Sequence, residues 1–296
     1  MKLSIITINF NNAEGLRKTL ASVAAQTYRN IEHIIVDGGS TDQSVDIIRD
    51  YYHRFEIGDL KLENVIWTSE PDTGIYNAIN KGIRKATGDY VWILNSGDCV
   101  AALDVVERMI SILNSLNANS LNITENVPIL IGNIVRLHDN KKGYAPLPVK
   151  QMKDENPRPI DVSMLTFYGG TVPQDAAFVR RDLFEKYGYF DESLKICADW
   201  KLYLNMIALG DIRPMHVNID VVLFDMTGIS NANNELRLAE RREYLEQILP
   251  SSVLRDYDTF SFPISQYQRL KKYHLWRVVW FFERVLFKLE KWKILK

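Results

Sequence analysis

The stretch Gly88–Val100, GDYVWILNSGDCV, is the most informative part of the chain for its fold. Residues 90–94 form a run of strand-forming side chains that stops abruptly at Asn95-Ser96-Gly97-Asp98. A carboxylate and small polar residues therefore stand where a buried strand should emerge. Two explanations of Asp98 are open at this point, because Asp is common in strand-ending turns and is also a ligand of hard cations.

The residues before this stretch alternate between short apolar segments and amphipathic segments. Nearly continuous apolar runs such as LSIITINF (3–10) are typical of strands that are covered on both faces. Regular alternation of such strands with helices predicts an α/β fold, a three-layer α/β/α arrangement around a mostly parallel sheet. Strands are expected at 3–10, 31–37, 65–69 and 90–95, and helices at about 13–25, from Ser40 or Thr41 to about 52, and at 73–86 with Ile75, Ala78, Ile79 and Ile83 on one face.

Polar side chains follow each of these four strands. In parallel sheets, ligands bind beyond the carboxyl ends of the strands. Turn chemistry explains any one of these residues equally well, but a shared site better explains all four strand ends together. The residues are Thr7, Asn9 and Asn11 after the first strand, Asp37 after the second, Glu70 and Asp72 after the third, and Asn95 and Asp98 after the fourth.

The rest of the chain is less regular. We expect a helix from about Leu103, a loop within 112–128, a strand at 129–137 and an exposed loop or hairpin at 138–159. A strand at 176–180, a short helix and a helix at 198–209 follow. The expected organisation is a catalytic domain over 1–225, with a nucleotide-binding half (1–100) and an acceptor half (101–225), followed by a helical extension over 226–296.

Composition excludes several classes of protein. With 46% hydrophobic and 25% charged residues among 296, the chain can bury a sizeable core, and a net charge of −1 gives no basic field for nucleic acid. Two cysteines cannot form a disulfide framework. The first residues do not resemble a signal peptide, and no apolar run is long enough to span a bilayer. These features predict a soluble, cytoplasmic protein.

The motifs leave one way of binding a nucleotide diphosphate. Neither GxxxxGK[ST] nor GxGxxG occurs, so no glycine loop on a helix terminus would cradle the phosphates. A divalent cation can replace such a loop, with carboxylate, phosphate and water oxygens as its ligands. Asp98 can supply one ligand, and Asn95 a carbonyl oxygen or a hydrogen bond to a bound water.

Four segments, in order, resemble the family-2 glycosyltransferases, which have the A-type nucleotide-sugar-binding fold. The resemblance covers about residues 1–225, and its variants DTGIYNAINKGI (72–83) and LNSGD (94–98) resemble bacterial enzymes that assemble cell-surface polysaccharides. The segments are SIITINFNNAEGLRKTLASVAAQTYRNIEHIIVDGGSTDQSVDII (4–48), EPDTGIYNAINKGIRKATGDYVWILNSGD (70–98), PQDAAFVRRDLF (173–184) and GYFDESLKICADWKLYL (188–204).

The resemblance implies roles for residues on both sides of the reaction. On the donor side it implies Thr7 and Asn9 in the nucleotide pocket and Asp37 at the uracil or ribose, with Ser40 and Asp42 in the same turn. It also implies Asp72 near the donor sugar or base. Lys81 or Arg84 would lie either at phosphate or on a solvated helix face. Elsewhere it implies Asp98 as the metal ligand, Asp199 as the catalytic base, Trp200 packing or lining the acceptor site, and Gln174 and Asp175 near the acceptor.

Two departures from the family pattern affect these roles. The usual metal motif is Asp-Ser-Asp-Asp, whereas Asn95 and Gly97 replace two of its acids here. We therefore expect Mg²⁺ or Mn²⁺ to bind weakly until a diphosphate arrives. Ala198 stands where the family usually has an acid before the base, which leaves Asp199 as the one candidate. Its alternative role is to cap the helix that starts there.

The function implied is inverting transfer of a sugar, most readily from a UDP-sugar, to a hydroxyl of a saccharide acceptor. Two alternatives stay open. A nucleotidyltransferase would need a glycine-rich basic loop after the first strand, which NFNNAEGLRK (9–18) does not provide. A non-catalytic nucleotide-sugar-binding or partner-binding subunit would fit the reduced metal motif.

The segment 273–296, YHLWRVVWFFERVLFKLEKWKILK, differs in composition from the rest of the chain. Aromatic and aliphatic residues alternate with Arg and Lys at helical intervals, and the longest uncharged run, Val278 to Phe282, is too short to span a bilayer. Two interpretations are open. The helix lies on an anionic membrane surface, which would suit a polyprenyl-linked acceptor, or it packs on the domain or a partner subunit.

Overall fold

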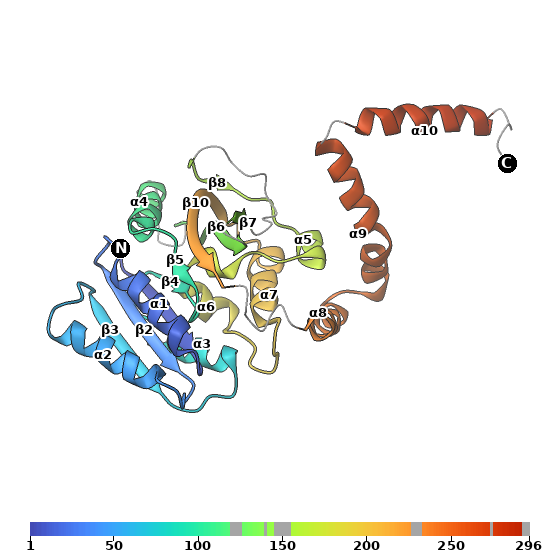
Figure 1. The fold of residues 1–296 in the computed structure, drawn as a ribbon. Helices are drawn as coiled ribbons and strands as arrows, with labels where there is room; N and C mark the ends of the chain where they lie inside the picture. The colour runs from blue at the N-terminus through green and yellow to red at the C-terminus, as the bar shows by residue number, and fades with distance from the viewer. Residues whose placement is uncertain (119–125, 139–140, 145–154, 226–232, 273–274, 292–296) are drawn as a thin grey trace. The chain divides into compact units, whose positions relative to one another are not determined.

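The structure is a computed structural model that describes residues 1–118, 126–138, 141–144, 155–225, 233–272 and 275–291. The chain forms two compact units, Met1–Arg242 and Glu243–Lys296. The first contains the whole sheet and the second contains helices (Figure 1). The boundary between them lies inside helix α8 (Asn234–Ile248). The division into a catalytic domain over 1–225 and an extension over 226–296 stays a prediction.

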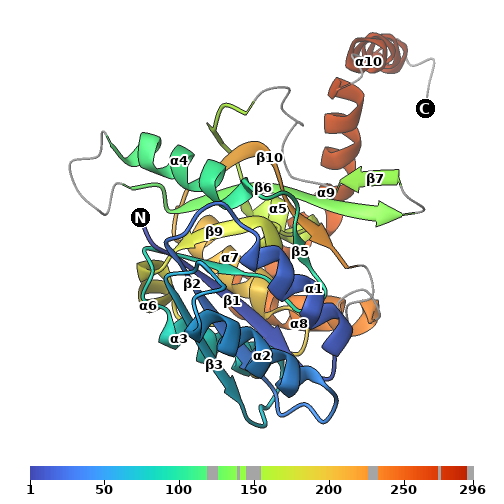
Figure 2. The same cartoon turned by 60° about the vertical axis from the view of Figure 1, so that its left-hand side comes forward.

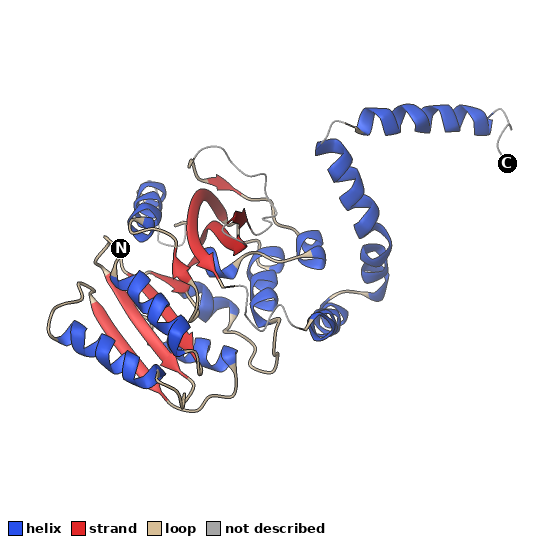
Figure 3. Cartoon of the chain, viewed as in Figure 1, coloured by secondary structure: helices blue, strands red, loops and turns tan. Residues whose placement is uncertain are grey.

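The first half of the sheet is parallel, as predicted. It consists of β1 (Leu3–Asn9), β2 (Ile31–Asp37), β3 (Asn64–Ser69) and β4 (Tyr90–Ile93), in the order β3-β2-β1-β4. Helices α1 (Ala13–Ala24), α2 (Ser44–Glu56) and α3 (Ile75–Lys85) connect these strands (Figure 3). The α/β class is therefore confirmed.

Beyond β4 the same sheet becomes mixed. It continues through β9 (Ala177–Arg180), β6 (Ile129–His138), β10 (Met215–Phe224) and β5 (Cys99–Val100). Strand β9 is antiparallel to both β4 and β6, whereas β10 runs parallel to β6. Within 138–159, expected to be an exposed loop or hairpin, β7 (Lys141–Tyr144) pairs antiparallel with β6 and β8 (Arg158–Pro159) pairs antiparallel with β10. Residues 139–140 and 145–154 of this segment lie outside the described residues. Strict strand–helix alternation ends near residue 100, and uniform parallel pairing ends with it.

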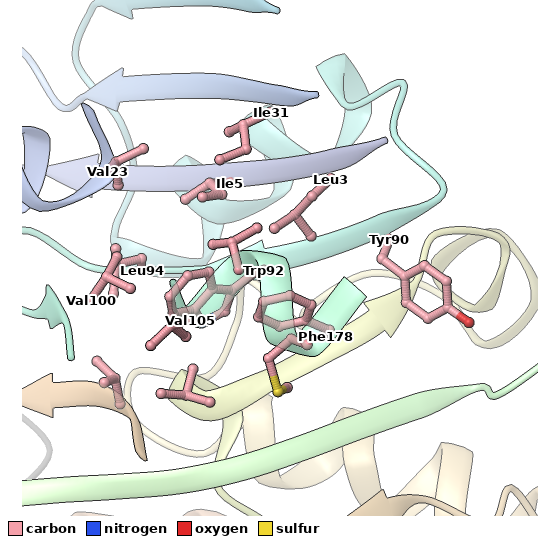
Figure 4. Packing of buried hydrophobic residues seen from close by; sticks show 14 of the residues in the cluster. Leu3, Ile5, Val23, Ile31, Tyr90, Trp92, Leu94, Val100, Val105 and Phe178 are labelled. Atoms are coloured by element: carbon pink, nitrogen blue, oxygen red, sulfur yellow. The ribbon is translucent and has the colours of Figure 1, made fainter. Parts of the chain in front are cut away.

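Helices cover both faces of the sheet (Figures 1 and 2). On the face under α1, α2 and α4 (Val105–Asn117), alternate apolar side chains of the strands, such as Leu3, Ile5, Ile31 and Ile35, enter one core. Trp92 of β4 lies in this core beside Phe178 of β9, with ring centroids 5.1 Å apart (Figure 4). On the other face, α3 approaches β1 closely enough that a Cβ at Gly82 would collide with Ile6.

Two details of the helix starts differ from expectation. Helix α2 begins at Ser44, and neither Ser40 nor Thr41 caps it. The Ser40 hydroxyl is instead donated to Asp37, 2.6 Å away, so it is not available to a helix terminus. Ile75, expected on the buried face of α3, is 41% exposed because it occupies the first position of the helix at the edge of the sheet.

Two further helices follow the predicted positions, α6 (Asp182–Tyr187) and α7 (Ala198–Tyr203). Helix α5 (Met164–Gly169) and the short helix η2 (Gln174–Ala176) were not predicted. Helix α7 continues as η3 (Leu204–Leu209), a stretch of π-helix, so the expected helix at 198–209 is present with a change of hydrogen-bond register.

The second unit contains α9 (Ser251–Lys272) and α10 (Trp276–Lys291). Among the residues that the structure describes, none of the helices is both long and apolar enough to cross a membrane.

Candidate active site

The polar residues singled out in the sequence gather along one edge of the sheet. The carboxyl ends of β1, β2, β4 and β10 lie at this edge, together with the amino end of β9, because β9 runs in the opposite direction. This topology places Asn9, Asp37, Asp98, Asp175 and Asp225 at the same side of the sheet. The grouping predicted from four strand ends is thus extended to strands that are distant in sequence.

Asp37 organises the donor side of this edge. Its buried carboxylate accepts hydrogen bonds from Asn9 Nδ2 (2.8 Å), the Ser40 hydroxyl (2.6 Å) and backbone N–H (2.9 Å), and the Ser69 hydroxyl (2.7 Å). Burial acts to raise the pKa of Asp37, but these hydrogen bonds outweigh it and hold the pKa below its usual value. Since four donors fill the acceptor positions of a carboxylate, Asp37 stays charged and fixes the turn that follows β2.

Asp72 lies against the same turn. Its Oδ1 accepts the backbone N–H of Gly74 at 3.0 Å, and its Oδ2 lies so close to Gly38 that a Cβ there would be 2.5 Å from it. The same Cβ would be 3.3 Å from the ring of Phe10, which is 63% exposed. An aromatic face, a carboxylate and a glycine backbone therefore meet at the ends of β1, β2 and β3, which is a suitable surface for a base and a ribose.

Asp98 lies at the other end of the edge and is 3% exposed. Its Oδ1 accepts the backbone N–H of Asp225 at 2.8 Å. The Asp225 carboxylate is close as well, because a Cβ at Gly97 would be 2.9 Å from Asp225 Oδ2. Burial raises the pKa of Asp98 to about 8, and the negative charges of Asp175 and Asp225 act in the same direction.

Asp175 is the next carboxylate along this edge. Its Oδ1 lies 3.4 Å from Asn95 Nδ2, and its backbone carbonyl accepts the indole N–H of Trp92 at 2.7 Å. Burial raises the pKa of Asp175 to about 7, and the nearby charge of Asp199 raises it further. The side chains of Asn95 and Gln174 each have a buried oxygen, Oδ1 and Oε1, without a hydrogen-bond partner in the described part of the chain.

Asp199 is on the first turn of α7 and is half-buried. Its Oδ1 lies 3.4 Å from the Tyr76 hydroxyl of α3, which donates to the Ile196 carbonyl at 2.5 Å. Burial raises the pKa of Asp199. Cys197 occupies the N-cap position, so Asp199 is not the N-cap residue of α7. A half-buried carboxylate whose pKa is raised by burial is a candidate proton acceptor.

Several residues predicted for the site are engaged by other protein groups. The fully buried Thr7 hydroxyl contacts His33 Nε2 at 3.0 Å. Lys81 pairs with Glu70 at 2.9 Å, in line with a solvated helix face. Trp200 is 1% exposed and donates its indole N–H to the Phe167 carbonyl at 2.8 Å, so of the two roles foreseen for it the packing role is the one observed.

The structure also adds residues that the sequence did not single out. Phe10 was passed over as the end of an apolar strand, although its place before Asn11-Asn12 was a signal that it emerges at the edge. Tyr76 and Asp225 had no local signal, because their partners are more than a hundred residues away. Glu240, which contacts the segment before α7, belongs to a helix of unremarkable polar sequence.

The described residues contain no cluster of three or more His, Cys, Asp or Glu side chains able to hold a metal ion by themselves. A separate polar hollow is lined by Arg108, Glu155, Asn218 and Asp220 and contains none of the predicted site residues. The strand edge thus has oxygen donors and buried carboxylates, but does not form a complete protein-only metal site.

Comparison with known proteins identifies the family. The model of glycosyl transferase family 2 matches residues 4–188, which is more than half of the chain. The chain belongs to this family. It is therefore a glycosyltransferase, which decides against the nucleotidyltransferase and the non-catalytic subunit.

Relatives of this family-2 glycosyltransferase occur in several bacteria. An uncharacterised glycosyltransferase of Mycobacterium tuberculosis is 32% identical over 232 residues, which cover 77% of each chain. A Mycobacterium bovis protein described as a PGL/p-HBAD biosynthesis glycosyltransferase is 26% identical and covers 77% of this chain and 78% of its own.

Solved structures support the A-type fold. S. aureus TarS 1–349 in complex with UDP-GlcNAc superposes with a TM-score of 0.61 at 18% identity, over 87% of this glycosyltransferase and 70% of that chain. A mannosyltransferase from Pyrobaculum calidifontis in complex with GDP-Man and Mn²⁺ gives a TM-score of 0.56 at 18% identity, over 81% and 60%. The chain spans only 42% of the longer TarS structure.

Proposed function

We propose that this family-2 glycosyltransferase transfers a sugar from a UDP-sugar to a hydroxyl group of a saccharide acceptor, with inversion at the anomeric carbon. The observation that carries the proposal is that two carboxylates at one edge of the sheet, Asp37 and Asp199, have opposite shifts in pKa. Asp37 is held ionised on the donor side, whereas Asp199 on the other side has a raised pKa. Groups whose environments push their pKa values apart are suited to different roles in catalysis.

The donor side favours a nucleotide. Phe10 offers an exposed ring for a base. The Ser40 hydroxyl donates to Asp37 and accepts the N–H of Asn11, the residue after Phe10, so it fixes the turn next to this ring. Asp72 borders this surface through Gly38. The superposable structures bind UDP, UDP-GlcNAc and GDP-Man, which supports a nucleotide-sugar donor. The roles foreseen for Thr7 and Lys81 stay predictions.

A divalent cation, Mg²⁺ or Mn²⁺, fits the residues at the far end of the edge. Asp98 has one oxygen engaged by the Asp225 N–H, and Asn95 Oδ1 is a buried acceptor without a partner among the described residues. We infer that Asp98 would hold the cation, with Asn95 beside it, and that the donor diphosphate supplies further oxygens. When bound, such a cation neutralises the charge that develops on the leaving diphosphate.

The transfer step needs a base, and Asp199 has the properties of one. As the acceptor oxygen attacks the anomeric carbon, the bond from that carbon to the diphosphate oxygen breaks. The hydroxyl proton passes to the Asp199 carboxylate, and the nucleoside diphosphate leaves. A raised pKa makes the ionised carboxylate a stronger proton acceptor. Attack from the face opposite the leaving group gives inversion.

We propose that Gln174 and Asp175 contribute to the acceptor side. Trp200 contributes indirectly, because its packing against Phe167 supports α7. Gln174 Oε1 is buried and has no partner within the described residues, so it is free to accept a hydrogen bond from a sugar hydroxyl. The mycobacterial relative described as a PGL/p-HBAD biosynthesis glycosyltransferase is compatible with a cell-surface glycoconjugate. We propose polysaccharide biosynthesis, with a polyprenyl-linked acceptor as one form of substrate.

We also propose that α10 attaches the enzyme to the inner face of the cell membrane, which leaves the catalytic unit in the cytoplasm. The support is that its apolar side chains are exposed, among them Trp280 at 51% and Phe282 at 59%. Binding of the full-length protein to anionic and neutral vesicles distinguishes this role from the alternative, in which α10 packs on a partner subunit.

A donor panel tests the proposed reaction. Full-length protein is incubated with UDP-GlcNAc, UDP-glucose, UDP-galactose or GDP-mannose and Mn²⁺, and the nucleotide product is measured with and without EDTA. Release of nucleoside diphosphate that EDTA abolishes is expected. Release of nucleoside diphosphate that is unchanged by EDTA would refute the requirement for a divalent cation. Release of pyrophosphate would refute glycosyl transfer.

The Asp199→Asn variant tests the base. It should lower turnover by about 10²- to 10⁴-fold, because proton transfer is lost, while UDP still binds. Asp211→Asn is the matched control, since Asp211 is exposed and lies beyond the end of η3. Turnover of Asp199→Asn at the level of the control would remove Asp199 from the mechanism.

A further inference from the structure

Glu240 of α8 contacts the segment that leads into the helix of Asp199. Its carboxylate accepts three consecutive backbone N–H groups, from Lys195 (2.7 Å), Ile196 (3.1 Å) and Cys197 (2.9 Å). The first N–H groups of a helix and of the turn before it have no partners within the helix, so an outside acceptor is needed. Glu240 supplies that acceptor and is only 8% exposed.

The same segment is held from its other side by α3. The Tyr76 hydroxyl donates to the Ile196 carbonyl at 2.5 Å and lies 3.4 Å from Asp199 Oδ1. The residue Ile196 is therefore fixed at its N–H by Glu240 and at its carbonyl by Tyr76. Because hydrogen bonds to a charged carboxylate are about twice as strong as neutral ones, Glu240 is the stronger of the two constraints.

Arg241 acts on the same helix from the next position. Its guanidinium lies 5.2 Å from the centre of the Trp200 ring, and its Nη1 donates to the Gly170 carbonyl at 3.2 Å. Its positive charge lowers the pKa of Asp199, against the larger effect of burial. Thus two adjacent residues of α8 act on the chain on either side of Asp199: Glu240 holds residues 195–197 before it, and Arg241 contacts the Trp200 ring after it.

We propose that Glu240 is a positioning residue for the transfer reaction: by fixing the backbone of residues 195–197, it sets the direction in which the Asp199 carboxylate points. The inference rests on the proposed role of Asp199 as the base. Glu240 lies beyond residues 4–188 matched by the family model, but inside the compact unit Met1–Arg242. The catalytic machinery of this chain therefore extends into α8.

The kinetic test compares Glu240→Ala and Glu240→Gln in the full-length protein. Turnover is followed as nucleoside diphosphate release from the donor panel with Mn²⁺, and UDP binding by calorimetry. For Ala we expect kcat to fall about 10- to 100-fold, because a misdirected catalytic group is costly, with donor KM and UDP affinity within about twofold. Gln retains one acceptor oxygen and should be intermediate. Glu235→Ala, an exposed position of the same helix, should match wild type.

A second readout does not depend on turnover. Amide hydrogen exchange at residues 195–197 should be at least about tenfold faster in Glu240→Ala, because the three N–H groups lose their acceptor. In the double variant with Asp199→Asn, removal of Glu240 should cause no further loss of turnover, since both changes act through one group. If Ala prevents folding, the Gln variant decides the same questions.

The outcomes separate the two proposals. Turnover of Glu240→Ala within about twofold of wild type, or a loss of UDP affinity equal to the loss of kcat, would refute the positioning role. If Asp199→Asn were fully active, the base assignment itself would fail. If Asp199→Asn were inactive while Glu240→Ala stayed active, only the inference about Glu240 would be overturned.

Discussion

Gly38 leaves the space that the Asp72 carboxylate occupies. A Cβ at this position would be 2.5 Å from Asp72 Oδ2 and 3.3 Å from Phe10, so any side chain would displace groups on the donor side. The half-buried Asp72 side chain can move away at modest cost to the fold. The consequence of a methyl group at residue 38 should therefore appear in nucleotide binding more than in stability.

We predict that Gly38→Ala weakens UDP binding about tenfold, which corresponds to about 1.4 kcal/mol, with a small change in Tm. Calorimetric titration with UDP and thermal unfolding are the two measurements. Gly169→Ala is the control, because a Cβ there meets no atom within 4 Å and its φ is not positive. Unchanged UDP affinity in Gly38→Ala would place the base and ribose elsewhere.

Two acidic residues from distant parts of the chain lie near Asp98, where the family motif has lost two of its own. The motif has lost two acids, but the structure brings two others to the same place, Asp175 from before β9 and Asp225 from after β10. Burial is the main cause of the raised pKa of Asp98, and the negative charges of these two carboxylates raise it further. The expectation of a site poor in acids was correct for the local sequence and incomplete for the folded edge.

At the scale of elements, β1, β2 and α2 are joined by a buried polar contact. His33 lies between the Thr7 hydroxyl and the Tyr51 hydroxyl, each 3.0 Å away, within an otherwise apolar layer. Burial lowers the pKa of His33 to about 3, compared with about 6.5 when the chain is unfolded. The unfolded chain thus takes up a proton that the folded chain excludes.

Stability should therefore fall as pH falls below about 6.5, and this loss would continue toward the folded pKa. At pH 5 the contribution of His33 amounts to about 2 kcal/mol, at about 1.4 kcal/mol per pH unit. The His33→Gln variant lacks this titrating group. We predict that the free energy of unfolding of wild type, measured with urea and compared with that of His33→Gln, is lower by about 2 kcal/mol at pH 5 than at pH 8. Parallel pH profiles of the two proteins would contradict the prediction.

The elements that the sequence predicted well are those whose signals are local. Strand β2 was expected at 31–37 and is found there, because a continuous apolar run between polar residues has one consistent explanation. The start of α2 was wrong by several residues, since Ser40 is attracted to Asp37 by a contact that depends on the fold. Asp98, Asp175 and Asp199 were foreseen through family motifs, whereas their mutual effects on pKa arise only when β4, β9 and α7 are packed.

Glu240 could not have been predicted from its own helix. The segment NELRLAERREYLEQI (234–248) is charged throughout, and nothing in its spacing distinguishes Glu240 from its neighbours. Its role follows from three backbone N–H groups more than forty residues earlier, for which Glu240 is the acceptor. Positions of this kind become visible only when the partners of each backbone group are followed in three dimensions.

At the scale of the whole molecule, α10 differs from the helices of the catalytic unit in what it exposes. Val278, Phe282 and Val285, one turn or two apart, are all exposed, with Phe282 at 59%. Arg277, Arg284 and Lys288 recur at helical spacing on a separate side of the helix. An apolar stripe beside a basic stripe is the arrangement of helices that lie in the interface of an anionic membrane.

We predict that the full-length protein sediments with phosphatidylglycerol vesicles and much less with phosphatidylcholine vesicles. High salt should weaken the binding, because screening reduces the attraction of Arg and Lys to anionic lipid. Phe282→Gln combined with Val285→Gln should lower vesicle binding by about tenfold or more, since two large apolar side chains can no longer enter the interface. Val253→Gln, an exposed position on α9, is the matched control. Vesicle binding by the α10 variant equal to that of the control, or sedimentation that does not depend on lipid charge, would instead favour α10 as a surface for a partner subunit.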